Sequence, residues 1–477
     1  MLPVQERRPS TAGRAPRYRR RAALCAAAAA AVAPAVLAGC GSTRPLPAAP
    51  VLTLTVALDV YALAQYGSAK TRAALYAQVL RGFEQQHRGL RVRQTAFLAT
   101  AENQAAIVAG SAPDVFPDCC SYGSYVYAGL LLPLDPYLKR DNIAPTLFSP
   151  GMVTWLTFPA GTFALSRETD ANAFALDLGV LDALGLAYPA PSWTHGDLAK
   201  LCAATAKPAA TARRYGATFI YGGFTLLREF SRGFGARLQN SARTRQILDT
   251  PEAVAAASWY FQDLYWPGLV TSGFSKAPGD TAIQNLDMNN VLHLYRVWGS
   301  ATKWRFQPAP VYPHGHSTAM AGNFWGISAT TRHADPAWEL LRWLAVGTEW
   351  QRFAMRTFLF PPGLNSLLAE WQHTVESVVP PLKGKGLEAF TEAGTRGWAS
   401  VAEINFQYAT TAALAADAQW WTQIQARQVG IREGFVQADR QVNALEQAAP
   451  AQQAAQRQAG KGFPSRGAPV ATVTPGL

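Results

Sequence analysis

The 477-residue sequence lacks the short motifs that mark several large classes of enzyme. It contains no Gly-x-Ser-x-Gly, His-Glu-x-x-His or Walker sequence, and only 31 of its residues are Asp or Glu. A glycosidase needs two carboxylates that face one bond from about 5 to 10 Å apart, and scarce acids make such a pair less available. The sequence therefore favours a non-enzymatic protein, with a surface-anchored glycan-active enzyme as an alternative.

Dense basic runs are also missing outside the N-terminal segment. The formal net charge is +12, but residues 1–39 hold seven arginines and one glutamate and so account for half of it. A nucleic-acid-binding surface requires Lys and Arg clustered along one face or one helix. We therefore expect no nucleic-acid partner.

The apolar stretch near the N-terminus is too short to span a bilayer. Residues 24–38 form 15 uncharged positions, whereas a transmembrane helix needs roughly 20. An arginine cluster at residues 17–21 precedes the stretch and small residues follow it. This order is typical of a secretory signal, so we predict a signal peptide over residues 1–39.

Leu37-Ala38-Gly39-Cys40 resembles the lipobox of bacterial lipoproteins. The resemblance implies cleavage before Cys40 and lipidation of Cys40. Three prolines in residues 41–50 indicate a tether, so we assign residues 40–50 to the lipidated cysteine and its tether. Acyl chains contribute roughly 0.8 kcal/mol per buried methylene, enough in combination for stable anchoring. We therefore expect an extracytoplasmic protein, periplasmic or at the cell surface, lipid-anchored to the cell membrane. An ordinary signal peptide with an incidental cysteine is the alternative, and the general and twin-arginine export routes both stay open.

Three further cysteines remain in the mature chain, Cys119, Cys120 and Cys202. No Cys-x-x-Cys spacing suggests a zinc site, and we favour buried thiols over a disulfide. His314 and His316 flank one glycine without a Cys or carboxylate nearby in the sequence. We therefore expect neither a metal nor another cofactor.

The periodicity of the mature chain predicts an α/β fold. Apolar residues alternate with polar ones over residues 52–58, which predicts a strand, and their spacing over residues 71–87 predicts a helix. A second strand opens at Val92. The strand–helix–strand order predicts mainly parallel sheets with helices on their faces.

Helix boundaries are marked at several places along the chain. Thr194 and Asp197 have the spacing of a capping box, and Thr250-Pro251 and Asp335-Pro336 place proline in a first helical turn. Near the C-terminus, Phe435, Ala438, Val442 and Leu445 make an apolar stripe. Residues 449–477 contain few residues that could form a core, so we predict a disordered tail.

Six short segments follow one another in a recognisable order. They are residues 108–115 (VAGSAPDV), 128–135 (AGLLLPLD), 161–177 with the later Gly-Leu and Ser-Trp-Thr of residues 185–194, 308–310 (PAP), 322–328 (GNFWGIS) and 337–341 (AWELL). Together they resemble the extracellular solute-binding proteins of family 1, over about residues 51–448. The usual Tyr-Asn is Leu176-Asp177 here, a proline is missing from residues 163–166, and residues 288–292 replace the usual Gly-Lys-Val-Ala-Met.

The resemblance implies a two-lobed periplasmic-binding-protein fold with a ligand cleft and a hinge between the lobes. One lobe would take residues 51–164 plus 320–358, and the other residues 165–319 plus 359–448. The lobes would close on a solute, and the membrane permease of an ATP-binding cassette importer would recognise the closed form. The implied solute is a sugar or oligosaccharide. A non-sugar solute such as a glycerol phosphate and a sensory role are alternatives. We expect a monomer.

Candidate ligand-binding residues follow from the expected sheets. In open α/β sheets, ligands lie beyond the carboxyl ends of the strands. A polyol site combines flat apolar platforms with a few well-placed polar groups. For each aromatic residue, core packing is the alternative role. The candidates are Asp59, Tyr61, Asp118, Tyr122, Trp155, Phe224, Trp298, Asn323, Phe324 and Trp325.

Overall fold

The computed structural model describes residues 51–58, 68–119, 122–207, 213–401 and 411–458. Residues 1–49 form one unit and residues 50–477 a second, and the elements below belong to the second. The predicted signal peptide, Cys40 and the tether residues through 50 lie outside the described residues, as do the candidates Asp59 and Tyr61. No helix in the described ranges combines the length and hydropathy needed to cross a bilayer.

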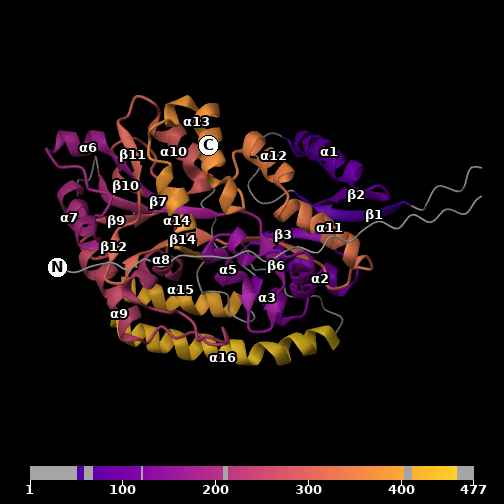
Figure 1. Cartoon of the computed structure of the whole chain (residues 1–477). Coiled ribbons are helices and arrows are strands. Elements are labelled where there is room, and N and C mark those ends of the chain that lie inside the picture. Colours follow the sequence, from indigo (N-terminus) through magenta and orange to yellow (C-terminus); the bar gives the residue numbers. More distant parts are fainter. Residues whose placement is uncertain (1–50, 59–67, 120–121, 208–212, 402–410, 459–477) are drawn as a thin grey trace, which may run out of the picture. The chain divides into compact units, whose positions relative to one another are not determined.

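The first sheet contains five strands that come from distant parts of the sequence (Figure 1). They are β1 (Leu52–Ala57), β2 (Leu90–Thr95), β3 (Val115–Cys119), β6 (Ala164–Ser166) and β15 (Asn323–Ile327). Their order is β2-β1-β3-β15-β6. β1 pairs in parallel with β2 and β3, whereas β15 runs antiparallel to β3 and β6.

The second sheet contains seven strands. They are β7 (Asp170–Asp177), β8 (Tyr215–Phe219), β9 (Val270–Ser272), β10 (Thr281–Asp287), β11 (Trp304–Gln307), β14 (Thr318–Ala321) and β16 (Ala399–Val401). The main order is β16-β14-β7-β10-β8-β9, and β11 also pairs with β7. Two small hairpins join β4 (Thr157–Phe158) to β5 (Gly161–Thr162) and β12 (Val311–Tyr312) to β13 (Gly315–His316).

The predicted α/β class is confirmed, but each large sheet is more mixed than the predicted mainly parallel one. Every antiparallel pair in the two large sheets involves β7 or β15. Both strands directly follow a passage of the chain from one sheet to the other, so they enter their sheet from the opposite end. Such crossing strands lack the strand–helix–strand pattern from which parallel pairing is predicted.

The chain passes between the sheets through very short segments. Residues 167–169 join β6 to β7, and Gly322 alone joins β14 to β15. A Cβ atom at position 322 would lie 2.7 Å from Val401 Cγ1 and 2.8 Å from the Trp155 ring, so only glycine fits there. A third passage follows α12 (Thr348–Phe358), where Leu359 adopts a φ of 56°. The assignment of residues to two lobes stays a prediction.

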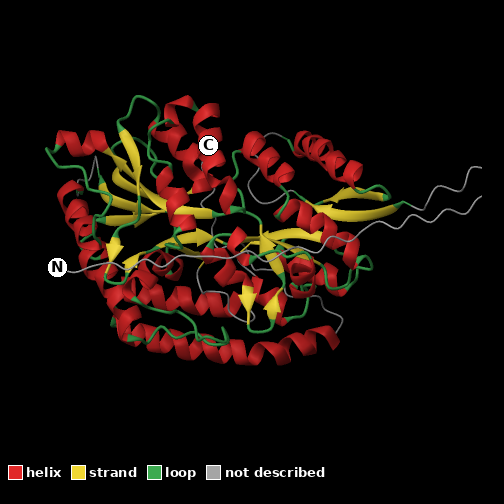
Figure 2. Ribbon diagram, in the orientation of Figure 1, coloured by secondary structure: helices red, strands yellow, loops and turns green. Residues whose placement is uncertain are grey.

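Helices pack on both sheets, as Figure 2 shows. α1 contacts β2, α11 contacts β3 and β15, and α12 packs against α1 and α11. Buried side chains such as Phe83, Phe116 and Trp338 fill the core between these elements. The helices of this part are α1 (Ala69–Gln86), α2 (Thr100–Val108), α3 (Tyr122–Tyr127), α4 (Asp135–Arg140), α5 (Pro150–Leu156), α11 (Ala334–Ala345) and α12.

A second core lies around the other sheet, where Phe174, Phe219 and Phe261 are fully buried. α7 packs on β8 and β10, α14 on β7, and the α15–α16 pair on α8 and α9. The helices are α6 (Leu178–Ala183), α7 (His195–Thr205), α8 (Phe224–Phe230), the 3-10 turn η3 (Ser231–Phe234), α9 (Pro251–Ser258), the π-helix η4 (Trp259–Tyr265), α10 (Val291–Trp298), α13 (Leu368–Val378), α14 (Glu388–Thr395), α15 (Thr411–Gln425) and α16 (Ile431–Gln458).

Two of the three predicted helix starts are confirmed, whereas α11 begins at Ala334, with His333 and not Asp335 as its N-cap. Thr194 Oγ1 accepts the Asp197 N–H at 3.1 Å, and the Asp197 carboxylate accepts the Thr194 N–H at 2.9 Å, which makes a reciprocal capping box. Thr250 Oγ1 accepts the Ala253 N–H ahead of α9. The Asp-Pro pair of residues 335–336 lies in the first turn of α11.

The C-terminal helix extends further than predicted. Phe435, Ala438 and Val442 are fully buried, as the apolar stripe predicts. The expected disorder from residue 449 is wrong for residues 449–458, because α16 continues to Gln458. Ala and Gln have high helix propensity, and adding residues to an existing helix is far easier than nucleating one. Residues 459–477 lie outside the described part of the chain.

Of the two cysteines in the described ranges, Cys119 and Cys202, Cys202 is a free thiol. Cys202 is fully buried, and its burial raises the pKa of the thiol. Cys119 is only partly buried, and Cys120 falls outside the described residues.

Candidate ligand-binding site

Three of the predicted site residues meet in one aromatic cluster. The ring centroid of Tyr122 lies 5.3 Å from that of Trp155 and 5.2 Å from that of Phe324, and the last two are 5.9 Å apart. All three side chains are buried. The Tyr122 hydroxyl donates to the Leu156 carbonyl at 2.8 Å and accepts the Phe163 N–H at 3.0 Å, and burial raises its pKa. These three buried rings therefore pack against one another and do not present open faces to a ligand.

Asp118 is a structural carboxylate, contrary to its expected place at the cleft rim. It is 3% exposed. Its oxygens accept hydrogen bonds from the Tyr125 hydroxyl at 2.5 Å, the Thr100 hydroxyl at 3.2 Å and the Cys119 N–H at 2.6 Å. The carboxylate joins β3 to α2 and α3 and is turned toward protein groups, not toward a solute.

Trp325 lies in the core, which corrects the expectation of an open platform. Successive residues of a strand point to opposite faces, so Phe324 joins the aromatic cluster and Trp325 points the other way. Trp325 has no exposed surface and packs 6.0 Å from Trp350, beside a cavity of only about 20 Å³. Asn323, one residue earlier, is partly exposed and donates its amide to Glu168.

Trp298 and Phe224 are core residues as well. Trp298 Nε1 donates to the Ser275 hydroxyl at 2.7 Å, and its ring packs edge-on against Trp304 at 5.8 Å. Phe224 packs between α8 and the C-terminal helices, 5.1 Å from the ring of Trp421. Both side chains are at least nine-tenths buried, so neither presents a face to a ligand.

A polar cavity of about 400 Å³ is the best candidate site. Its walls come from three segments distant in sequence: α5, residues 231–243 and β16. Of the predicted residues, Trp155 borders it. The described lining residues are Gly151, Thr154, Trp155, Ser231, Arg232, Gly235, Ala236, Arg237, Leu238, Gln239, Asn240, Ser241, Arg243, Ser400 and Val401. The next residues along the chain, 402–410, lie outside the described part.

The segment 231–243 supplies most of this wall, and the sequence reasoning missed it. Its signal is visible in the sequence, where SRGFGARLQNSAR places three arginines among glycine, serine, asparagine and glutamine. The Asn240 carboxamide accepts the N–H groups of Thr244 and Arg245 at 2.8 and 3.1 Å. This fixes the tight turn that begins at Asn240 and carries Arg243 toward α5.

Arg243 bridges the cavity from the turn to α5. Its Nη1 donates to the Trp155 carbonyl at 2.6 Å and its Nη2 donates to the Thr154 carbonyl. The guanidinium also lies 4.6 Å from the centre of the Phe158 ring. Beside it, the Tyr127 hydroxyl donates to the Ala242 carbonyl at 2.8 Å. These contacts hold the turn against elements that belong to the first sheet's half of the chain.

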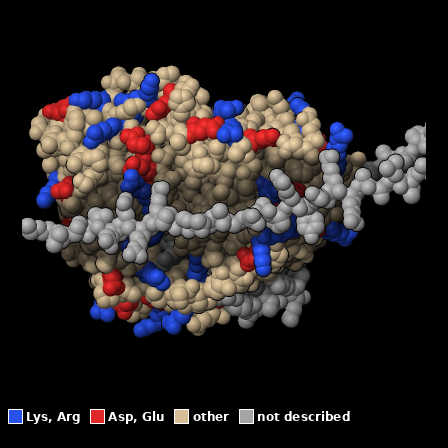
Figure 3. All heavy atoms as spheres, viewed as in Figure 1, with Lys and Arg blue, Asp and Glu red and all other residues tan. Residues whose placement is uncertain are grey.

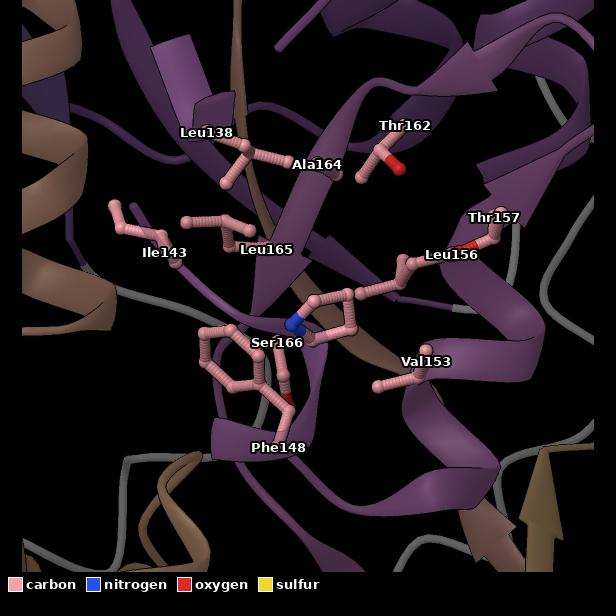
Figure 4. A pocket seen from close by; sticks show the side chains of 11 residues that line it. Leu138, Ile143, Phe148, Val153, Leu156, Thr157, Thr162, Ala164, Leu165 and Ser166 are labelled. Atoms are coloured by element: carbon pink, nitrogen blue, oxygen red, sulfur yellow. The ribbon is translucent and has the colours of Figure 1, made fainter. Parts of the chain in front are cut away.

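The other cavities fit a sugar less well. An apolar cavity of about 40 Å³ lies beside β6, with Leu138, Ile143, Phe148 and Leu165 turned toward it (Figure 4). Pockets that hold small molecules are usually about 300 to 1,000 Å³, so this one is too small. A shallower hollow of about 460 Å³ lies over α7 and the loop before it, and its wall is built from one short stretch of chain.

Four carboxyl groups are buried where the chain crosses between the sheets. Glu168, Asp170, Glu229 and Asp287 are each at most 5% exposed. Asp170 accepts both the main-chain and side-chain N–H groups of Asn289, at 3.0 and 2.7 Å. Burial raises the pKa of Asp170, Glu229 and Asp287, and the neighbouring carboxyls raise that of Asp287 further.

Glu229 is held by four donors. It accepts from Asn172, from Asn285 at 3.2 Å, from the Thr318 hydroxyl at 2.9 Å and from the Ala319 N–H at 3.1 Å. Such fully bonded buried groups fix the geometry of strands. Across the described residues, no group of three or more His, Cys, Asp or Glu has the geometry to hold a metal ion. We assign the buried carboxyls to structure.

Charges are mixed on the face of the molecule that Figure 3 shows, where Lys and Arg are interspersed with Asp and Glu. Among the described residues, several basic side chains are paired with acidic ones, as Arg352 is with Glu370 at 2.9 Å and Arg432 with Asp249 at 2.8 Å. This face carries no basic stripe of the kind that nucleic acid requires.

One family model matches the chain, and several solved structures share its fold. The model for bacterial extracellular solute-binding proteins matches residues 66–346. No curated protein sequence matches the chain. The sugar-binding protein MalE from Xanthomonas citri is 17% identical, with a TM-score of 0.67 over 84% of this chain and 98% of that one. A sugar transporter of Rhizobium etli, in an open conformation, is 16% identical, with a TM-score of 0.65 over 82% and 99%.

A third solved structure is the substrate-binding protein of Listeria monocytogenes in complex with cycloalternan. It is 14% identical, with a TM-score of 0.63 over 83% of this chain and 98% of that one. These likenesses confirm the two-lobed periplasmic-binding-protein fold. The family model covers more than half of the sequence. The chain therefore belongs to the bacterial extracellular solute-binding proteins.

Proposed function

We propose that the protein is the lipid-anchored extracytoplasmic receptor of an ATP-binding cassette importer and that it delivers a carbohydrate to the permease. The observation that carries this proposal is the 400 Å³ polar cavity in a chain of this family. Its walls belong to segments that the sequence assigns to different lobes, where a ligand would be enclosed when the lobes close. Sugar-binding proteins among the structural neighbours support a carbohydrate.

The lining of the cavity suits a polyol. Ser231, Gln239 and Ser400 line it with hydroxyl and amide groups, Val401 lines it with an apolar side chain, and the buried Trp155 borders it. Binding sites of this kind place a few polar groups on a largely preformed wall. A glycan-active enzyme would need two carboxylates at the solute, whereas no Asp or Glu occurs among the described residues that line the cavity.

Ligand binding can be tested by thermal denaturation of the full chain. A ligand that binds only the folded state raises the melting temperature by an amount that grows with its concentration. We expect a concentration-dependent increase with at least one member of a panel of mono- and oligosaccharides and their charged derivatives, without cleavage of that ligand. Release of shorter sugars would instead support the enzymatic alternative. The absence of any shift across the panel would contradict the receptor.

Lobe closure has a separate readout. The passages between the sheets are short, as at Gly322 and residues 167–169, and such segments act as hinges. With a saturating ligand from the panel, the radius of gyration from small-angle X-ray scattering should decrease. An unchanged radius with bound ligand would contradict closure by hinge rotation.

A further inference from the structure

The edge of the first sheet carries exposed arginines where the chain enters the folded unit. β1 begins at Leu52, and β2, the outermost strand in the order β2-β1-β3-β15-β6, lies directly beside it. Arg88 in the turn before β2, and Arg91 and Arg93 in β2, are all exposed. We propose that these three residues, the edge arginines, bind the anionic phospholipid surface of the membrane that carries the anchor. This inference rests on the lipid anchor of the proposed function.

The pairing of β1 with β2 brings the edge arginines close to the point where the tether joins the folded unit. Leu52 N–H donates to the Gly89 carbonyl at 2.9 Å, and Thr53 lies opposite Arg91 in the parallel register. The tether over residues 40–50 spans at most about 40 Å when fully extended. A lipid at the start of the tether would therefore keep the edge arginines near the bilayer.

Two of the edge arginines lie on the open face of the strand. Successive residues of a strand alternate between the two faces of a sheet, so Arg91 and Arg93 share one face while Leu90 and Val92 share the other. Leu90 and Val92 pack against the core. Val51, which immediately precedes β1, is 52% exposed. At a membrane surface, basic side chains contact the headgroups while an apolar side chain enters the boundary beneath them.

The edge arginines form no ion pair with a carboxylate in the described part of the chain. Arg91 Nη1 donates to the main-chain carbonyl of the preceding residue at 2.9 Å, and that group carries no net charge. Two carboxylates bind the main chain of these strands instead. Glu84 accepts the Val92 N–H at 2.9 Å. Asp114 accepts the Thr55 N–H at 2.8 Å. The edge arginines therefore present unpaired positive charge to the solvent.

Because the chain would be tethered, a weak contact is sufficient. Each arginine near an anionic surface strengthens binding roughly fivefold, so three of them would hold a free protein only loosely. A tether makes the contact intramolecular, at an effective concentration far above that of the free protein. The alternative role of the edge arginines is to prevent pairing of β2 with another strand, as charged side chains on edge strands often do.

The test holds the chain on vesicles without its own lipid. Residues 50–477 form a unit of their own, so a chain that starts at residue 41 keeps this unit whole. A hexahistidine tag at its N-terminus would bind a nickel-chelating lipid in phosphatidylcholine vesicles, with or without phosphatidylglycerol as the anionic lipid. Modification by the arginine reagent phenylglyoxal, followed by mass spectrometry, would report the accessibility of each arginine.

The rates of modification should differ between the two kinds of vesicle only at the edge of the sheet. We expect Arg91 and Arg93 to react slower by about threefold or more on the anionic vesicles than on the neutral ones. Arg245 and Arg440, which are exposed on segments around the second sheet, should react equally on both and serve as controls within the same molecule. The difference should vanish at about 0.5 M salt, because the attraction is screened.

Matched double variants make the test specific to the edge arginines. Arg88→Gln with Arg93→Gln removes two of the three charges and should abolish most of the protection of Arg91. Arg245→Gln with Arg440→Gln changes the net charge by the same amount and should leave that protection unchanged. All four side chains are exposed, so both variants should keep the melting temperature of the wild type.

The outcomes separate this inference from the proposed function. Equal modification on both kinds of vesicle would overturn the membrane contact and leave the receptor and its anchor in place, because the tag and not the lipid holds the chain. Protection of Arg91 on neutral vesicles that grows with protein density would show pairing between two β2 edges and also overturn it. Protection that survives Arg88→Gln with Arg93→Gln would place the membrane contact elsewhere. Lipid labelling and solute binding are measured independently of all three.

Discussion

Arg243 donates through Nη1 to the main-chain oxygen of Trp155 at 2.6 Å, across 88 positions of sequence. The bond joins the turn after η3 to the C-terminal end of α5, where helix carbonyls have no intrahelical partner. Arg243 reaches this position with a φ of 57°, in the left-handed region. A non-glycine residue there is strained, so the contacts of the side chain must outweigh that strain.

Two substitutions of Arg243 should therefore differ. Arg243→Ala removes the bonds to Thr154 and Trp155 and keeps the strain, and we expect a loss of about 1–2 kcal/mol in the free energy of unfolding. Arg243→Gly removes the same bonds but adopts a positive φ freely, so it should be more stable than the alanine variant by up to about 1 kcal/mol. Urea denaturation measures both, with Arg245→Ala as the control. Equal stability of the Ala and Gly variants would mean that the backbone is unstrained.

Trp325 should behave as a core residue. It has no exposed surface, so Trp325→Ala should cost about 3–5 kcal/mol in the free energy of unfolding of the unliganded protein. Trp325→Phe keeps most of the buried area and should cost less. Chemical denaturation without ligand, followed by calorimetry at a temperature where each variant is folded, separates stability from affinity. An alanine variant with unchanged stability but lost binding would show that Trp325 contacts the ligand and is not a core residue.

Asp417 should make stability depend on pH. Its side chain is 4% exposed, and Gln246 Nε2 donates a hydrogen bond to it at 2.9 Å. Burial, together with the neighbouring carboxyls of Asp439 and Glu446, raises its pKa to about 7. Since the pKa is higher in the folded than in the unfolded protein, the folded state binds more protons between about pH 4 and 7. The contribution of Asp417 to stability is therefore present at low pH and is lost as pH rises through that window.

The isosteric variant Asp417→Asn removes this titration. Relative to the wild type, it should be more stable at pH 8, and the advantage should vanish toward pH 4, with a slope of at most about 1.4 kcal/mol per pH unit. Unfolding in urea at a series of pH values measures the difference curve. A difference that stays constant with pH would show that Asp417 has the same pKa in both states.

Cys40 should carry the lipid if the lipobox is functional. Metabolic labelling with a fatty acid in an expressing bacterium should mark the wild type, and Cys40→Ala should prevent both labelling and processing before position 40. A mutation of Cys202, which is buried in the folded chain, is the control and should keep the label. Equal labelling of wild type and Cys40→Ala would contradict lipidation at this residue.

Local signals were enough to predict the α/β class and most of the helix starts, because each depends on neighbours in sequence, whereas the two-lobed fold was implied by the resemblance to a family. The reciprocal bonds of Thr194 and Asp197 need only three residues of helix, and alternation over residues 52–58 needs only one strand. Predicting the ligand site also required contacts between residues that are distant in sequence. Whether Asp118 faces a solute depends on Thr100 and Tyr125, which approach it from two other elements.

Trp325 shows the same limit within a single strand. The sequence marks residues 322–328 as a segment that resembles the family, but it does not show which face of β15 points toward a ligand, so Phe324 and Trp325 could not be told apart. The arginines at the cavity are visible in the sequence, but their meeting with α5 depends on a positive φ at Arg243 that no local preference of arginine indicates.

Gly322 has a mechanical consequence for the cavity. The missing side chain at this position lets the strand connection pack directly on both Trp155 and Val401, and both residues also line the cavity. A rotation of one sheet relative to the other about this connection would therefore move residues that line the cavity. The shape of the cavity is in this way coupled to the angle between the sheets.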